Sequence, residues 1–173
     1  YHKSKLVPGA EKMPFQNLLF PLLGDQILKI GSSTSLGNFS PQDSVSLFNS
    51  KTILADSSIN QLHYSIAPII CYESIYGNYV RQFVQKGAQA IFIITNDGWW
   101  KQTSGYKQHS MYAKLRAIET RCYIARSANT GTSGFINQRG DELQKSEYLT
   151  LDCLRQKIKC NEKITFYVKY GDV

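Results

Sequence analysis

The sequence contains no apolar run approaching the roughly 20 residues that a membrane-spanning helix needs. None of its four cysteines forms a C-x-x-C pair, and His63 and His109 do not show metal-ligand spacing, so we expect neither a zinc site nor another cofactor. Arg-rich blocks and interleaved aromatic and basic residues are missing as well. Their absence argues against a nucleic-acid partner. Cys153 and Cys160 could pair in an oxidising compartment.

What is present fits one folded domain. The chain has 173 residues, of which 42% are hydrophobic and 12% aromatic, enough for a sizeable core. Its net charge of +7 is either a solvated basic surface or an attraction to anionic lipid headgroups. The chain starts at Tyr1 and not at Met, so we expect it to be part of a longer protein.

One stretch, residues 67–74, stands out because an apolar run ends in Cys71, Tyr72 and Glu73. A segment with helical spacing follows directly, from Ile75 to Lys86. A thiol held at a strand end and the start of a helix is favoured as a thiolate. We therefore expect Cys71 to be a nucleophile; the alternative is that it is a small buried hydrophobic residue.

The periodicity predicts an α/β fold. Short strands separated by polar turns come first and favour antiparallel pairing, with Asn49-Ser50 as a tight turn. Helices and strands then alternate, and the strand 90–94 has the continuous apolar pattern of burial on both faces. The predicted strands are 45–48, 51–55, 62–70, 90–94, 122–126, 133–136, 147–151 and 164–168; the predicted helices are 76–85 and 106–120, the latter with an apolar stripe of Met111, Leu115 and Ile118.

Several separate segments carry a family resemblance. They are Tyr1 to Pro14 (Y-x-K-x-x-L-V-P-x-x-E-x-x-P), Ile70 to Glu73, Thr95 to Trp100, Gln108 to Glu119 and Arg126 to Gly131. In this order the chain resembles the apolipoprotein N-acyltransferase family of the nitrilase, or carbon–nitrogen hydrolase, superfamily. The resemblance implies an α-β-β-α sandwich, present here in part over residues 1–173. The family's first strands and its membrane helices are expected to lie outside this chain.

The resemblance also implies a reaction and roles for residues. Cys71 would accept an acyl chain from a phospholipid as a thioester and pass it to the α-amino group of a diacylglyceryl-cysteine at a lipoprotein N-terminus. Lys3 would supply positive charge, and the general-base glutamate is expected to lie outside this chain. We expect a location at the bacterial inner membrane with this domain on the periplasmic side.

Other residues are assigned supporting roles by the resemblance. The backbone N–H of Tyr72 would stabilise the oxyanion, Glu73 and Glu11 would hold the surrounding loops, and Trp99 and Trp100 would line the acyl pocket. Surface charge for Glu11, helix-start charge for Glu73 and core filling for the tryptophans are the alternatives. His109 is expected to make structural hydrogen bonds and not to form a dyad with Cys71.

Two other functions remain open: a soluble nitrilase-type amidase, and a catalytically incomplete fragment that binds lipid. The apolar residues 15–23 form either a short core helix or a flap that touches lipid.

Overall fold

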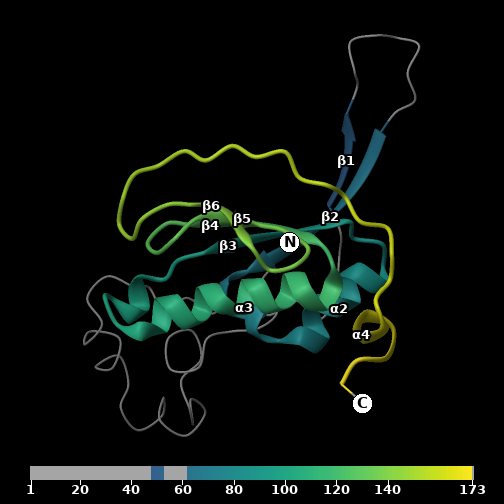
Figure 1. The fold of residues 1–173 in the computed structure, drawn as a ribbon, viewed down its shortest axis with the longest axis horizontal. Coiled ribbons are helices and arrows are strands. Elements are labelled where there is room, and N and C mark those ends of the chain that lie inside the picture. Colours follow the sequence, from purple (N-terminus) through teal and green to yellow (C-terminus); the bar gives the residue numbers. More distant parts are fainter. Residues whose placement is uncertain (1–47, 53–61, 173) are drawn as a thin grey trace, which may run out of the picture. The chain divides into compact units, whose positions relative to one another are not determined.

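The computed structural model describes residues 48–52 and 62–172 (Figure 1). The elements in chain order are β1 (Phe48–Thr52), β2 (Leu62–Ile70), the 3-10 helix η2 (Cys71–Ile75), α2 (Gly77–Gln85), β3 (Ala90–Thr95), the 3-10 helix η3 (Gly98–Trp100), α3 (Ser104–Thr120), β4 (Tyr123–Ala128), β5 (Gly134–Ile136), β6 (Glu142–Lys145) and α4 (Phe166–Tyr170).

The six strands form a single sheet in the order β1-β2-β3-β4-β5-β6. Its centre is parallel, since β2 pairs with β3 and β3 with β4 in the same direction. The outer pairs are antiparallel. The helices α2 and α3 connect the parallel strands, which places the carboxyl ends of β2, β3 and β4 at one edge of the sheet. The predicted α/β class is confirmed.

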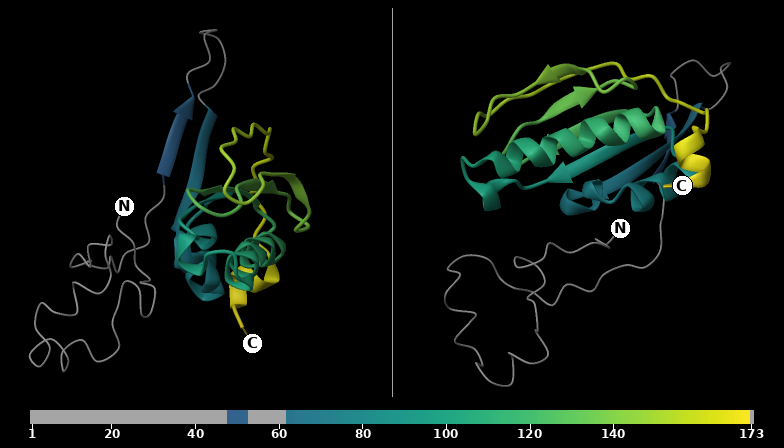
Figure 2. Two further views of the ribbon diagram at one scale, coloured as in Figure 1. Left: turned by 90° about the vertical axis from the view of Figure 1, so that its left-hand side faces the viewer. Right: turned by 60° about the horizontal axis from the view of Figure 1, so that its bottom comes forward.

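Helices α2 and α3 lie against one face of this sheet (Figure 2). The core between them is apolar and includes Ile91 and Ile93 of β3, Phe83 of α2 and Ala113 of α3. The opposite face of β3 carries Phe92 and Ile94, which are 37% and 62% exposed. The expectation that β3 is buried on both faces is therefore wrong, because helices of the described residues cover only one side of it.

The start of the described region differs from the prediction in one respect. The antiparallel pairing of the first strands is confirmed by β1 and β2. However, Asn49-Ser50 lies inside β1 and does not form a turn, because both residues pair with β2. The predicted strands 45–48 and 51–55 are thus one strand over 48–52, and their remaining residues lie outside the described ones.

The C-terminal part departs further from the sequence pattern. The hairpin turn predicted at 138–141 is confirmed, but its second strand is β6 and not 147–151, a segment without strand pairing. The predicted strand 164–168 is instead the short helix α4, which begins where the Thr165 hydroxyl accepts from the Val168 N–H. Cys153 and Cys160 are free thiols and do not pair.

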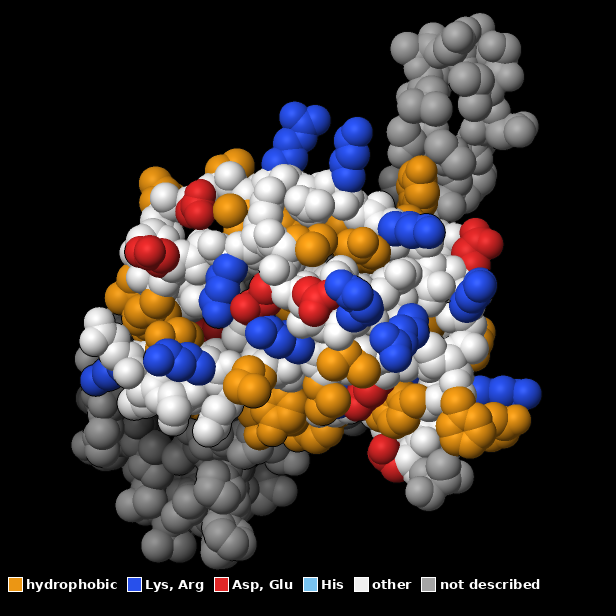
Figure 3. Space-filling view, in the orientation of Figure 1, with side chains coloured by type: hydrophobic (Ala, Val, Ile, Leu, Met, Phe, Trp, Pro, Cys, Tyr) orange, Lys and Arg blue, Asp and Glu red, His pale blue; other side chains and the backbone are white. Residues whose placement is uncertain are grey.

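The apolar stripe of α3 faces away from the core. Met111, Leu115 and Ile118 are 62%, 43% and 41% exposed, whereas Ala113 and Ala117 are fully buried. Figure 3 shows apolar side chains with lysine and arginine side chains among them over this region. The small alanines allow α3 to approach the sheet closely, and polar residues fill the rest of its inner face. Within the described ranges no helix combines the length and apolar content needed to cross a bilayer.

Candidate active site

Polar residues gather where the three parallel strands end. Cys71 follows β2 directly, Asn96 and Asp97 follow β3, and Asn129 follows β4. The register aligns Ile70 with Ile94, and Thr95 with Ala128, so these ends are neighbours. In open sheets with parallel strands, ligands bind in the crevice outside such carboxyl ends. This edge is therefore the candidate active site.

Cys71 has an unusual backbone conformation. Its φ angle is +51°, in the left-handed region that side chains other than glycine rarely adopt. Such a residue costs about 1–3 kcal/mol and persists only when its surroundings hold it. The residue is 6% exposed, and it opens a 3-10 helix of five residues and not the longer α2. The expected strand–Cys–helix order is present, with the helix start split in two.

Neighbouring side chains hold this turn. The Ser74 hydroxyl donates to the carbonyl oxygen of Cys71 at 2.8 Å. The Glu73 carboxylate is fully buried, and its Oε2 accepts the N–H of Ile70 at 2.8 Å. Arg116 of α3 donates to the carbonyl oxygens of Ser74 and Ile75 at 3.3 Å and 2.8 Å. Glu73 thus ties the turn to the end of β2. Its place in the first turn of η2 also fits the helix-start alternative, and its supporting role stays a prediction.

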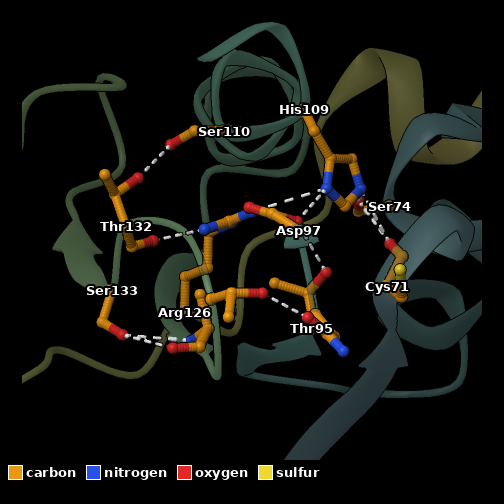
Figure 4. A network of polar contacts seen from close by, with 12 residues as sticks. Cys71, Ser74, Thr95, Asp97, His109, Ser110, Arg126, Thr132 and Ser133 are labelled. Atoms are coloured by element: carbon orange, nitrogen blue, oxygen red, sulfur yellow. Dashed lines mark hydrogen bonds and ion pairs between the residues drawn. The ribbon is translucent and has the colours of Figure 1, made fainter. Parts of the chain in front are cut away.

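A buried charged network lies behind the turn (Figure 4). His109 Nδ1 is 2.9 Å from Asp97 Oδ1, and Arg126 Nη2 is 2.5 Å from Asp97 Oδ2. On its other side, His109 Nε2 is 3.1 Å from the carbonyl oxygen of Cys71 and 3.2 Å from Ser74 Oγ. The network therefore joins the end of β3, helix α3 and strand β4 to the residue predicted to be the nucleophile.

Opposing effects act on the carboxyl group of Asp97. Burial is the largest and raises its pKa, but the hydrogen bond from His109 and the charge and hydrogen bond of Arg126 together outweigh burial. The net effect lowers the pKa of Asp97, so this carboxylate is ionised at neutral pH. Arg126 is itself 5% exposed and also donates to the carbonyl oxygen of Thr132.

The turn after β4 is hydrogen-bonded to the end of β3. The N–H of Asp97 donates to the carbonyl oxygen of Thr130 at 2.7 Å, and the N–H of Asn129 donates to that of Thr95 at 3.0 Å. Gly131, with φ of +132°, approaches Asp97 so closely that a Cβ would lie 2.5 Å from its Oδ2. The turn of Asn129, Thr130 and Gly131 thus caps the end of β3.

The predicted pocket residues belong to η3. Trp99 is 43% exposed. Trp100 packs its ring against that of His109, with centroids 5.0 Å apart, and lies over Gly105 at the start of α3. Trp100 therefore shields the buried network. Neither tryptophan is a buried core residue, and an acyl pocket at either one remains a prediction.

Tyr72 is the second residue of η2. Its ring makes an edge contact with Tyr76 at a centroid distance of 5.7 Å. Burial, followed by the neighbouring Tyr76 and Tyr112, raises the pKa of its phenol. Lys3 and Glu11, like residues 15–23, fall outside the described residues. Their roles stay predictions.

Sequence reasoning missed the joint role of Asp97 and Arg126. Both stood inside the quoted motifs, T-N-D-G-W-W and R-S-A-N-T-G, and His109 was expected only to make hydrogen bonds, which it does. The signal was available, since all three are polar residues that follow or interrupt buried segments. Among residues 48–52 and 62–172, no cluster of three histidine, cysteine or acidic side chains could hold a metal ion.

Sequence comparisons identify relatives of this chain. Over its full length the chain is 31% identical to the apolipoprotein N-acyltransferase of Chlorobaculum tepidum and 30% identical to that of Wigglesworthia glossinidia brevipalpis. It spans 31% and 32% of the length of these curated relatives.

Solved structures show the same fold at low sequence identity. The glutamine-dependent NAD+ synthetase of Acinetobacter baumannii matches with a TM-score of 0.52 and 15% identity, over 66% of this chain and 21% of that one. Residues 1–156 match the family described as Carbon-nitrogen hydrolase. The chain therefore belongs to the carbon–nitrogen hydrolase family and has its nitrilase-like α/β fold.

Proposed function

We propose that the protein carrying this chain is an N-acyltransferase acting on apolipoproteins, with residues 1–173 as part of its hydrolase-like domain. The observation that carries the proposal is the strained, buried Cys71 at the carboxyl end of β2. Relatives named apolipoprotein N-acyltransferase match the chain from end to end at about 30% identity. This match favours acyl transfer over amide hydrolysis.

In the proposed first step, the Cys71 thiolate attacks the carbonyl carbon of a phospholipid acyl ester. A carbon–sulfur bond forms, the carbon–oxygen bond breaks, and the lysophospholipid leaves as an alcohol that takes up the proton removed from the thiol. Lys3 would lie near the developing oxyanion, with the N–H of Tyr72 as a second donor. A glutamate outside this chain would carry the proton.

In the second proposed step, the α-amino group of a diacylglyceryl-cysteine attacks the thioester. The amide bond forms and the carbon–sulfur bond breaks. The glutamate takes the proton of the amine and passes it to the leaving thiolate, which restores the thiol. The proposed partners are therefore a phospholipid donor and a lipoprotein acceptor at the bacterial inner membrane. The net charge of +7 suits an anionic lipid surface.

Mass spectrometry of the full-length protein incubated with phospholipid tests this function. An acyl adduct is expected on Cys71, absent in Cys71→Ala and retained in Cys153→Ser, which removes an exposed thiol. The adduct should disappear when a diacylglyceryl peptide is added, as the acyl chain moves to its amine. The absence of any adduct, or ammonia release from amide substrates alone, would favour the amidase alternative.

A further inference from the structure

Two cavities on the outer side of α3 share the side chain of Met111. The first, of about 470 Å³, lies between α3, β6 and the residues that follow β6. The second is a groove of about 520 Å³ on α3 itself, lined by Gln108, Met111, Tyr112 and Leu115. Volumes of this size are typical of sites for small molecules. Because Met111 lines both, one molecule with a polar and an apolar part fits across the two cavities.

The first cavity is rich in cations. It is lined by Lys107 and Lys114 of α3 and by Lys145 of β6, together with Glu142 and Glu147. Glu142 lies between two of these lysines, 3.1 Å from Lys114 Nζ and 3.3 Å from Lys145 Nζ. The lysines outnumber the carboxylates by one, so a group with a single negative charge balances the cavity. A phosphodiester has this charge, and lysine is a common partner of phosphate groups.

Buried hydroxyl groups line the same cavity. They belong to Ser110, Thr132 and Ser146. The Ser146 oxygen accepts the N–H of Ser133 at 2.9 Å, which leaves the hydroxyl proton of Ser146 to donate. Phosphate oxygens accept protons from hydroxyl groups as well as from ammonium groups. The hydroxyls and the lysines therefore suit the same ligand group.

The adjoining groove suits a hydrocarbon chain. Its side chains Met111, Tyr112 and Leu115 are 62%, 37% and 43% exposed. Ile118, 41% exposed, continues the row along α3. An acyl chain laid along this row would release water from both apolar surfaces, which favours the contact.

We propose that this face of α3 binds one anionic phospholipid of a membrane surface, with its phosphate group among Lys107, Lys114 and Lys145 and an acyl chain along Met111 and Leu115. The bound lipid holds the domain against the membrane. The net charge of +7 favours approach to such a surface.

This lipid is not the acyl donor of the proposed reaction. His109 lies on the inner face of α3 and contacts the carbonyl oxygen of Cys71, whereas Met111 and Leu115 lie on the outer face. The helix therefore stands between Cys71 and the lipid site. The proposal goes beyond the proposed function and does not require Cys71 to be a nucleophile.

The charges favour a lipid over a second copy of the chain. In a twofold dimer through this face, each copy presents the same surface to the other. The lysines of the two copies would then meet, and like charges in contact are unfavourable. Figure 3 shows lysine and arginine side chains among the apolar ones on this side of the molecule. An anionic lipid surface attracts such a mixture of cations and apolar groups.

The test is photolabelling of the full-length protein in phosphatidylcholine vesicles. The vesicles contain a small fraction of phosphatidylglycerol with a photoactivatable diazirine in one acyl chain, or of phosphatidylcholine with the same modified chain. Mass spectrometry of proteolytic fragments locates the label. We expect the anionic probe to label residues 108–118 and the zwitterionic probe to label them severalfold less, because only the first supplies the missing negative charge.

A double variant tests the headgroup half of the site. Lys107→Gln with Lys145→Gln removes two cations and leaves the third lysine of the cavity paired with Glu142. We expect it to lower the labelling of residues 108–118 about tenfold, since each lysine near an anionic surface contributes severalfold to binding. Lys157→Gln with Lys159→Gln is the matched control, because both lysines are exposed and line neither cavity. Its labelling should be unchanged.

A second double variant tests the groove. Met111→Gln with Leu115→Gln replaces two exposed side chains, so circular dichroism should show a folded protein. We expect labelling to fall severalfold, because the acyl chain loses its apolar partners. Unchanged labelling in this variant or in the lysine variant would overturn the proposal.

Three further results would also overturn it. Equal labelling by the two probes would show that the headgroup is not recognised. Loss of the label when glycerol 3-phosphate is added would indicate a site for a free phosphate and not for a lipid. Crosslinking of α3 to a second copy of the chain, in place of the lipid, would show that this face is a protein interface.

The variant Cys71→Ala separates this proposal from the proposed function. It cannot form the acyl adduct but should keep the label on α3. A label that is lost in this variant would mean that the lipid reaches α3 through Cys71, and would reject a separate site. A label on α3 together with no acyl adduct on the unsubstituted protein would support the lipid site and reject the acyltransferase.

Discussion

At the scale of single residues, Asp97 is the centre of the candidate site. Its two carboxylate oxygens bind His109 and Arg126, and Thr95 donates to one of them at 3.0 Å. The side chain is fully buried, so removing its charge would leave Arg126 without its counterion in a place that water does not reach. Asp97 thus supports the fold and holds the network that reaches the carbonyl oxygen of Cys71.

We predict that Asp97→Asn lowers the free energy of unfolding by about 3–5 kcal/mol at pH 7. The lowered pKa of Asp97 means that the native state favours the ionised form more than the unfolded chain does. This contribution is present above the unfolded pKa of about 3.9 and is lost as pH falls through the lower native value. Urea denaturation from pH 7 to pH 3 should therefore show the two proteins converging in acid. A gap that is independent of pH would contradict the ionic origin.

At the scale of elements, the turn after β4 is as important as the helices. It binds the end of β3 through Thr130, and its Gly131 leaves space only for the Asp97 side chain. The inner face of α3 is also polar. It buries His109, Ser110, Arg116 and Thr120. Site residues therefore occupy the helix face that an apolar pattern would normally fill.

A pair of glycine substitutions tests the turn. Gly131→Ala is expected to cost about 1–3 kcal/mol for its φ of +132° and about 1–3 kcal/mol more for crowding Asp97. Gly87→Ala is the matched control, because Gly87 has φ of +100° but nothing within 4 Å of the added Cβ. Chemical denaturation should rank Gly131→Ala below Gly87→Ala. Equal losses would show that contact with Asp97 is unimportant.

At the scale of the whole molecule, the two faces of the sheet are unequal. Helices α2 and α3 bury Ile91 and Ile93 on one side. On the other, Phe92 and Ile94 stay partly exposed, and residues 152–154 line a cavity with them. An α-β-β-α sandwich has a second sheet against this face, and the described residues form only one sheet.

We predict that Ile93→Ala lowers the free energy of unfolding by about 2–5 kcal/mol, as in a packed core, and that Ile94→Ala changes it by about 0.5 kcal/mol or less. The two residues are neighbours on β3 with 1% and 62% exposure, so each controls for the other. Similar losses from both substitutions would contradict the difference between the two faces.

We also predict that the isolated chain of 173 residues is weakly stable, because no second sheet of the described residues covers the face of β3 that carries Phe92 and Ile94. A sharp two-state melt well above ordinary temperature would contradict this prediction.

The sequence by itself determined the order of helices and strands from β2 to β5, the position of Cys71 at the end of an apolar strand, and the hairpin turn after β5. These follow from local periodicity and turn residues, which act over a few positions. Its errors lie where a local pattern has two solutions. The 164–168 segment alternates enough for a strand, but capping by Thr165 and contacts with α2 and α3 make it a helix.

Only the tertiary structure decided which polar residues meet. Cys71, Asp97, His109 and Arg126 come from four different elements, and the parallel register of β2, β3 and β4 brings them together. It also decided that α3 turns its alanines and polar residues inward, because a charged network needs partners in the interior. Neither choice follows from residue spacing, since both depend on contacts between segments far apart in the chain.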